Sequence, residues 1–240
     1  MDETVRAIIL AGGRGRRLEP YTSVLPKPLM PVGDRAIVEI IVDRLVECGI
    51  TDITLCVGYL AHLIEAVFNG RPRGARMTYV HEETPLGTAG PLRLVEGLNG
   101  TFLLMNGDLL TDLQFDELVD LHRRAGNVLT IATHERKHVM DYGILQTEPG
   151  EFPRVTAYHE KPETSLLVSM GVYVMEPEVL DRIPTSGYFD FPQLVHRLLD
   201  EGCNVGTFPF SGFWLDIGRR DDYETALDQW QRGTEDGASS

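Results

Sequence analysis

The sequence predicts an α/β fold, in which a mostly parallel sheet carries helices on both of its faces. Apolar runs and amphipathic stretches alternate through the first half of the chain, as strands and crossover helices do. The first apolar run ends directly in a glycine-rich loop, which is typical of the ligand-binding edge of such a sheet. A length of 240 residues suits one large domain with a substantial core.

Each element of the first half follows from its local pattern. Ala7–Leu10 is a short apolar run that reads as a buried parallel strand, and apolar residues recur at helical spacing over 37–48, with Gly49 as a C-cap. Further strands are predicted at Ile53–Val57, Met77–Val80, Phe102–Met105 and Val128–Thr133, and further helices at about Ala61–Phe68, Thr88–Glu96 and Gln114–Arg124. This order predicts a parallel sheet whose ligands bind at the carboxyl ends of the strands.

The second half has shorter strands, predicted at Ile144–Leu145, Arg154–Tyr158 and Leu166–Met175, followed by two late helices. We expect this part to be an insertion that walls one side of the site. Only residues 231–240 follow Trp230, so a single domain over 1–240 is expected.

Composition excludes several classes of partner. Hydrophobic residues make up 42% and charged residues 24% of the chain, which are ordinary globular values. The net charge of −14 argues against nucleic acid and anionic membranes, because both select basic surfaces. Cys48, Cys56 and Cys203 lie far apart in apolar surroundings and lack metal-binding spacing. With an acidic start and no apolar run of membrane-spanning length, we expect a cytoplasmic protein.

The segment from Leu10 to Pro31 reads LAGGRGRRLEPYTSVLPKPLMP. Three glycines alternate with arginines, and Lys27 lies between two prolines; glycines let backbone N–H groups approach an anion that the cations neutralise. The spacing predicts a polyphosphate-binding loop. It is not a Walker A loop, because no Lys-Ser or Lys-Thr follows the glycines. It is not a dinucleotide fingerprint either, because Leu18 occupies the third glycine position.

The loop resembles the opening motif of the sugar-1-phosphate nucleotidyltransferases, the nucleoside-diphosphate-sugar pyrophosphorylases. The resemblance continues in the family's order through PLGTAGPL, NGD, YG, EKP, GVYV and WLDIG, ending at Gly218. It implies a Rossmann-like, three-layer nucleotide-diphospho-sugar transferase fold with an inserted sugar-binding β subregion. Larger relatives carry a C-terminal β-helix, for which we expect no room here.

The resemblance also implies the reaction. A sugar-1-phosphate oxygen attacks the α-phosphorus of a nucleoside triphosphate, and pyrophosphate leaves. The nucleophile is already an anion near neutral pH, so catalysis needs positioning and charge stabilisation rather than a general base. The matching positions imply four catalytic residues, Arg17, Lys27, Asp108 and Lys161. Nucleotide binding is implied for Leu10, Ala11, Gly12, Gly13, Gly15, Arg17, Lys27, Glu82, Pro85, Gly87 and Thr88.

Two further sets of residues follow from the matched motifs. Sugar binding is implied for Asn106, Gly143, Glu160, Lys161, Ser169 and Gly171. Ser169 replaces the asparagine that is usual in the family, which leaves the identity of the sugar open. Asp108 and Asp216 are the implied Mg²⁺ ligands, and Mg²⁺ takes few protein oxygens besides those of the phosphates.

Glu82 indicates which nucleobase the triphosphate carries. A carboxylate can accept hydrogen bonds from guanine N1–H and its amino group, whereas the glutamine frequent in thymidylyl and uridylyl relatives suits thymine or uracil. The motif around Glu82 most resembles mannose-specific guanylyltransferases, so GTP and mannose-1-phosphate are favoured. UTP, dTTP or CTP with another hexose-1-phosphate is the alternative. The expected partners are these small molecules, and a homo-oligomer is left open.

Two other classes compete. His134–His138 matches the zinc-protease string HExxH, which works only on a helix. Here it follows a β-rich run, and we expect an exposed turn. A catalytically idle nucleotide-sugar sensor on the same fold is disfavoured because Arg17, Lys27 and Asp108 are all present.

Overall fold

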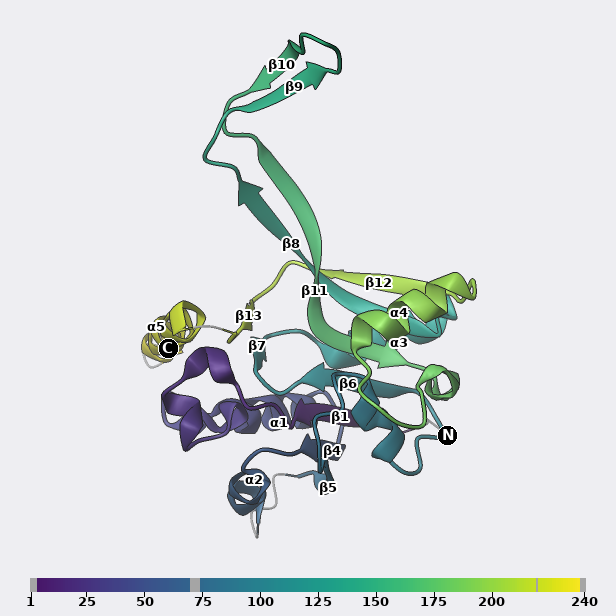
Figure 1. Ribbon diagram of the computed structural model, residues 1–240. Helices are drawn as coiled ribbons and strands as arrows, with labels where there is room; N and C mark the ends of the chain where they lie inside the picture. Colours follow the sequence, from purple (N-terminus) through teal and green to yellow (C-terminus); the bar gives the residue numbers. More distant parts are fainter. Residues whose placement is uncertain (1–3, 70–73, 219, 238–240) are drawn as a thin grey trace.

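A computed structural model describes residues 4–69, 74–218 and 220–237 of the chain. Seven strands form the central sheet in the order β12-β8-β11-β6-β1-β4-β5 (Figure 1). They are β1 Arg6–Ala11, β4 Asp52–Val57, β5 Arg76–His81, β6 Phe102–Asn106, β8 Leu129–Val139, β11 Glu163–Met175 and β12 Val205–Phe210. Strand β11 runs antiparallel to β6 and β8, while the other pairings are parallel. The predicted α/β class and mostly parallel sheet are therefore confirmed.

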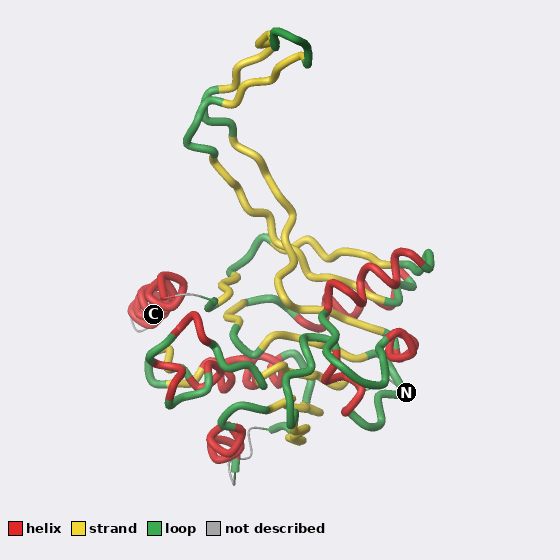
Figure 2. Tube along the Cα trace, viewed as in Figure 1, coloured by secondary structure: helices red, strands yellow, loops and turns green. Residues whose placement is uncertain are grey.

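Helices cover both faces of the sheet, as Figure 2 shows in red. Alternate side chains of β1 point to opposite faces, so Ile9 joins one buried cluster and Ile8 the other. The first cluster is covered by α1 (Ile37–Glu47), α2 (Ala61–Phe68) and α3 (Phe115–Ala125); the second is covered by α4 (Phe191–Asp200) and the 3₁₀ segments η4 (Gly90–Leu94) and η5 (Pro177–Arg182). The predicted three layers are present.

The order of the strands places the ligand-binding edge. Strand β1 pairs with β4 on one side and β6 on the other, with Ile9 opposite both Leu55 and Met105. The chain thus leaves β1 in one direction and later returns on its other side. Such a switch point opens a crevice at the carboxyl ends of the strands. The glycine loop follows β1, and Asp108 follows β6.

A long β-arm leaves the body of the molecule (Figure 1). The outer halves of β8 and β11 pair as an extended ribbon, with Val139 opposite Glu163. The ribbon continues into a hairpin of β9 (Ile144–Glu148) and β10 (Arg154–His159). The predicted strands in this region are confirmed, but this part of the insertion projects as an arm instead of forming the expected wall beside the site, because its ribbon pairs only with itself.

Two local predictions were wrong, and one strand of the central sheet was missed. The helix over Thr88–Glu96 is only the short η4, because Gly90-Pro91 starts it and the amides of Ala89 and Gly90 bond to the Phe189 carbonyl (3.1 and 2.9 Å). The HExxH string lies within β8 rather than in an exposed turn, because residues 134–138 pair with β11. Strand β12 was not predicted; its glycine and proline weaken the strand pattern.

The remaining helix predictions hold. Gly49 adopts a left-handed conformation (φ 78°) just after α1, as a C-terminal cap requires. The two late helices are α4 and α5 (Arg220–Gly237). Within the described residues, no helix combines the length and apolar character needed to cross a bilayer.

Candidate active site

The glycine loop lines a cleft of about 600 Å³ at the switch point. Gly15 holds a left-handed conformation (φ 62°), and its carbonyl accepts hydrogen bonds from Leu18 N–H and from the Thr22 hydroxyl, both at 2.9 Å. A Cβ at Gly15 would lie 3.1 Å from Cβ of Lys27. This tight turn therefore folds the loop back so that Lys27 lies beside the glycines.

All of the predicted nucleotide residues meet in this cleft. Its lining includes Leu10, Ala11, Gly12, Gly13, Gly15, Arg17, Lys27, Glu82, Pro85, Gly87 and Thr88, together with Asn106, Asp108 and Asp216. The sequence reasoning left out Arg14, Arg16, Pro28, Leu86, Gly107, Tyr188 and Gly218, which also line it. Arg14 and Arg16 belong to the basic run, a signal that was available. Tyr188 carries no motif that could have revealed it.

Lys27 and Asp108 face each other across the cleft floor. Lys27 begins the 3₁₀ segment η3 (Lys27–Leu29), is 8% exposed and forms an ion pair with Asp108 Oδ2. Asp108 Oδ1 is buried and has no hydrogen-bond partner in the described part of the chain. A buried carboxylate oxygen without a partner is costly, so this atom is available to a cation.

Strand pairing brings Asp216 to the same place. The short β13 (Trp214–Asp216) pairs antiparallel with β7 (Leu109–Thr111), and Ile217 N–H donates to the Asp108 carbonyl at 3.0 Å. Partial burial of the Asp216 carboxyl, and next the charge of Asp108, raise its pKa; Lys27 and Arg17 oppose this rise. Two carboxylates that repel each other beside an unpartnered oxygen fit a hard divalent cation. The described residues contain no group of three or more His, Cys, Asp or Glu side chains placed to hold a metal ion.

Glu82 directly follows β5 and lies against the glycine loop. Its Oε2 accepts a hydrogen bond from Leu86 N–H (3.2 Å), and a Cβ at Gly12 would lie 2.3 Å from its Oε1. Glycine at position 12 therefore allows Glu82 to close against the loop. Burial raises the pKa of Glu82, which the Leu86 N–H and Arg93 oppose.

The predicted sugar residues are divided between the cleft and the arm. Asn106 lines the cleft, and Gly171 (φ 74°) lies behind it, where a Cβ would be 2.5 Å from Asn106 Nδ2. Ser169 Oγ accepts a hydrogen bond from Gly171 N–H (3.3 Å). These three residues form one group because β11 pairs with β6 at this point.

Gly143, Glu160 and Lys161 lie outside the cleft, at the junction between the ribbon and the terminal hairpin. The Tyr158 hydroxyl donates to Glu160 Oε2 (2.5 Å), and a Cβ at Gly143 would lie 2.2 Å from that hydroxyl. Lys161 has a left-handed backbone (φ 43°), which is uncommon for a residue with a side chain. The structure groups Gly143 and Glu160 with Tyr158 on the arm, and a sugar contact there stays a prediction.

Comparisons with known proteins agree with this geometry. The family model described as "Nucleotidyl transferase" matches residues 6–233. A mannose-1-phosphate guanyltransferase beta-A of Xenopus laevis is 33% identical over 93% of this chain and 64% of its own length. Among solved structures, HddC from Yersinia pseudotuberculosis superposes with a TM-score of 0.71 at 23% identity, covering 94% of this chain and 99% of that one. A UDP-glucose pyrophosphorylase complexed with UDP-glucose gives a TM-score of 0.74 at 20% identity, covering 96% and 100%.

The two kinds of comparison support different conclusions. The solved structures are distant in sequence and show the fold alone, that of the nucleotide-diphospho-sugar transferases. The chain spans less than two thirds of the length of the curated relatives it matches. The family match covers nearly all of the described residues, glycine loop and WLDIG motif included. The chain therefore belongs to the nucleotidyl transferase family, that of the sugar-1-phosphate nucleotidyltransferases.

Proposed function

We propose that this protein transfers a nucleotidyl group from a nucleoside triphosphate, preferably GTP, to a hexose-1-phosphate, preferably mannose-1-phosphate. The products are the nucleoside-diphosphate sugar and pyrophosphate. The observation that carries the proposal is the meeting of Lys27, Asp108 and Asp216 beside the glycine loop in one cleft. Curated relatives about 33% identical to this chain carry the name mannose-1-phosphate guanyltransferase, which supports the choice of substrates.

The arrangement suits an in-line displacement at the α-phosphorus. The sugar phosphate oxygen forms a bond to this phosphorus while the bond to the bridging oxygen of the β-phosphate breaks. Arg17 would bind the leaving β- and γ-phosphates, and the buried Lys27 would neutralise the α-phosphate and the incoming phosphate. Backbone N–H groups of the glycine loop add fixed dipoles. The attacking phosphate oxygen is already an anion, so the proposed reaction needs no general base.

Asp108 and Asp216 would hold Mg²⁺, which bound there would screen the phosphate charges and orient the triphosphate. The unpartnered Oδ1 of Asp108 supports this assignment. In the sugar subsite, Asn106 would be supported by Gly171 and Ser169. Glu160, Lys161 and Gly143 would act from the arm.

We further propose a single catalytic domain over 1–240 in a reducing, cytoplasmic compartment, which the free thiols of all three cysteines support.

The test is pyrophosphate release across a grid of nucleoside triphosphates and sugar-1-phosphates with Mg²⁺. Turnover confined to GTP with one hexose-1-phosphate would support the proposal and name the product. Turnover with UTP, dTTP or CTP would keep the reaction and overturn the base assignment. Binding of a triphosphate without release in any well would support the idle sensor instead.

A further inference from the structure

The N-terminus of α4 is bonded to the cleft loop Pro85–Gly90, although about a hundred residues separate them in sequence. The Phe189 carbonyl accepts from the N–H groups of Ala89 (3.1 Å) and Gly90 (2.9 Å), and Phe189 N–H donates to the Leu86 carbonyl (2.9 Å). Gly87 holds φ 86°, and a Cβ there would lie 2.5 Å from the Phe189 oxygen. The backbones are thus in close contact, and only glycine fits at position 87.

Asp190 makes the side-chain part of this junction. Its Oδ1 accepts from Thr88 N–H (3.0 Å) and from the Thr88 hydroxyl (3.2 Å). The Thr88 hydroxyl oxygen in turn accepts from Phe191 N–H at 2.8 Å. A hydrogen bond from the Tyr188 hydroxyl to Asp190 raises the pKa of Tyr188. One carboxylate therefore joins Thr88, Tyr188 and the first turn of α4.

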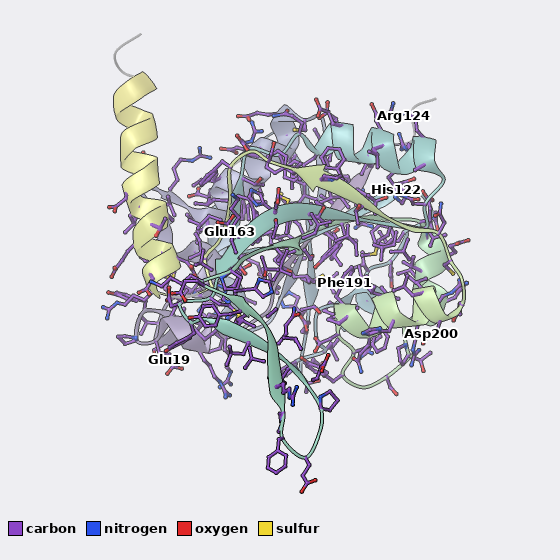
Figure 3. All side chains as sticks on the ribbon, turned by 90° about the horizontal axis from the view of Figure 1, so that it is seen from above. Glu19, His122, Arg124, Glu163, Phe191 and Asp200 are labelled. Atoms are coloured by element: carbon purple, nitrogen blue, oxygen red, sulfur yellow. The ribbon has the colours of Figure 1, made fainter. Side chains whose placement is uncertain are left out.

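The members of this junction differ in their access to the cleft. Thr88 and Tyr188 line it, whereas Asp190 is not among the described residues that do. Figure 3 shows Phe191 at the end of α4 that faces the middle of the molecule, with Asp200 at the outer end. Helix α4 is itself anchored in the core through Phe191, Leu194 and Leu198, which are buried. A rigid helix thus supports a loop that has little regular structure of its own.

We propose that Asp190 is a positioning residue of the nucleotide subsite, which holds Thr88 and Tyr188 at the cleft wall against bound triphosphate. This inference rests on the proposed function, since it assigns the Pro85–Gly90 loop to the nucleotide. A charge-assisted acceptor is suited to the role, because its Oδ1 accepts from both the backbone N–H and the hydroxyl of Thr88. Tyr188 supplies the cleft with an exposed aromatic ring next to that loop.

The test measures the dissociation constant of GTP with Mg²⁺ by calorimetry, in the absence of sugar phosphate so that no turnover occurs. We expect Asp190→Ala to weaken GTP binding about 10-fold or more, because misplacement of a contacting group by about 1 Å has effects of this order. Asp190→Asn retains an acceptor oxygen and a good N-cap, so most of the affinity should return. The Michaelis constant for the sugar phosphate should change little in both variants.

Gln193→Ala is the matched control. The Gln193 side chain caps the same helix end by accepting from Asp190 N–H (2.8 Å), but it has no bond to the loop. It should leave GTP affinity within about twofold. Hydrogen exchange of the Ala89 and Gly90 amides should quicken in Asp190→Ala and stay slow in Gln193→Ala.

The outcomes separate the two proposals. If Asp190→Ala binds GTP as tightly as the wild type, or if Gln193→Ala weakens binding equally, Asp190 is a helix cap only and the positioning role is overturned. If the wild-type protein binds GTP but turns over no substrate pair, the proposed function fails while the affinity comparison still decides the role of Asp190. A wild-type protein that binds no triphosphate overturns both.

Discussion

Asp108 takes part in both interactions expected at the cleft, the ion pair with Lys27 and the binding of a divalent metal ion. One of its oxygens pairs with Lys27, and the other is buried without a partner in the described structure. Removal of Lys27 would leave Asp108 without its ion-pair partner beside Asp216, and a bound divalent ion would compete with Lys27 for this carboxylate. We therefore expect Lys27 to move from Asp108 to phosphate as substrates and metal bind.

Asp108→Asn keeps the shape of the side chain and removes its charge. We expect turnover to fall about 10²–10³-fold, as for the loss of one preorganised charged group in an active site. The apparent affinity for Mg²⁺ should weaken as well, which a titration of activity against Mg²⁺ measures. Asp120→Asn, an exposed aspartate of α3, is the control. Unchanged Mg²⁺ dependence in Asp108→Asn would contradict the metal assignment.

Glu82 predicts a pH dependence of kcat/KM for GTP that tests whether this side chain recognises the guanine base. Burial raises its pKa, and only the ionised form can accept both guanine donors. An ordinary glutamate has a pKa of about 4.3. As the pH is lowered, kcat/KM for GTP should therefore begin to decline at a higher pH than such a glutamate would produce. In Glu82→Gln this decline should disappear, together with most of the preference for GTP over UTP. An identical acid limb in the variant would assign the titration to another group.

At the scale of single residues, sequence reasoning identified what local motifs carry. Arg17, Lys27 and Asp108 sit in recognisable strings, and the structure brings all three into one cleft. Asp190 was missed because its role comes from contact with a loop about a hundred residues away. Nothing in the local sequence distinguishes it from an ordinary N-cap. Long-range pairing, rather than residue type, creates this function.

At the scale of elements, the cleft depends on how closely β1 and β6 approach. Gly107 N–H donates to the Leu10 carbonyl at 2.9 Å, and a Cβ at Gly107 would lie 2.7 Å from the same oxygen. This contact joins the ends of two parallel strands directly before Asp108. The strands were predicted from their apolar runs, whereas their adjacency follows from the topology of the sheet.

Gly107→Ala tests this contact. The added methyl group would collide with backbone atoms, which cannot rotate away, so the strand ends must separate. We expect the free energy of unfolding, measured by urea denaturation, to fall by about 1–3 kcal/mol. Turnover should fall by a larger fraction of its wild-type value than the free energy of unfolding does. Gly150→Ala is the control, because a Cβ there has open space. A stable, fully active Gly107→Ala variant would show that the strand ends are free to shift.

A buried polar network joins α3 to the sheet. His122 is 0% exposed; its Nε2 lies 3.1 Å from Glu176 Oε1, and its Nδ1 lies 2.8 Å from Thr130 Oγ1. Asn127 also donates to the Thr130 oxygen at 2.9 Å. Because a carboxylate oxygen accepts, Nε2 donates to Glu176, and Nδ1 accepts from the Thr130 hydroxyl. His122 is then neutral with its proton on Nε2, shared with Glu176. Burial lowers the pKa of His122, and Glu176 opposes this effect.

This network predicts a loss of stability in mild acid. Because the folded-state pKa of His122 is lowered, the unfolded chain binds more protons once the pH falls below about 6.5. Stability is therefore intact above that pH and declines as the pH falls toward the folded-state pKa. The unfolding midpoint should drop more steeply between about pH 7 and 5 in the wild type than in His122→Gln. Parallel curves would show that His122 does not contribute.

At the scale of the whole molecule, the protein consists of a body that contains the cleft and an arm that projects from it (Figure 1). The arm bears exposed apolar side chains, among them Tyr142, Phe152 and Tyr158. A two-stranded ribbon without a covering layer gains little stability from burial. The sequence predicted strands here and a wall beside the site. Alternating strand patterns carry no information on whether a ribbon folds back or projects, so the position of the arm had to come from the structure.

Removal of the arm separates the two substrate subsites. Residues 140–162 can be replaced by an Asn-Gly turn, because Val139 and Glu163 are paired and such a turn joins directly opposed strand ends. All predicted nucleotide contacts lie in the body, so the dissociation constant for GTP should stay within about threefold. Gly143, Glu160 and Lys161 are lost, and turnover should fall at least about 100-fold if they bind the sugar phosphate.

Lys161→Ala should reproduce part of this loss as a raised Michaelis constant for the sugar phosphate. Lys137→Ala is the matched control, since Lys137 is an exposed lysine of the same arm, paired with Glu163 (2.8 Å). Near-normal turnover without the arm would place the whole sugar subsite around Asn106, Ser169 and Gly171. Loss of GTP binding would instead make the arm part of the nucleotide subsite. Because the arm lies outside the cleft in this structure, this pair of measurements decides whether Lys161 contributes to the sugar subsite at all.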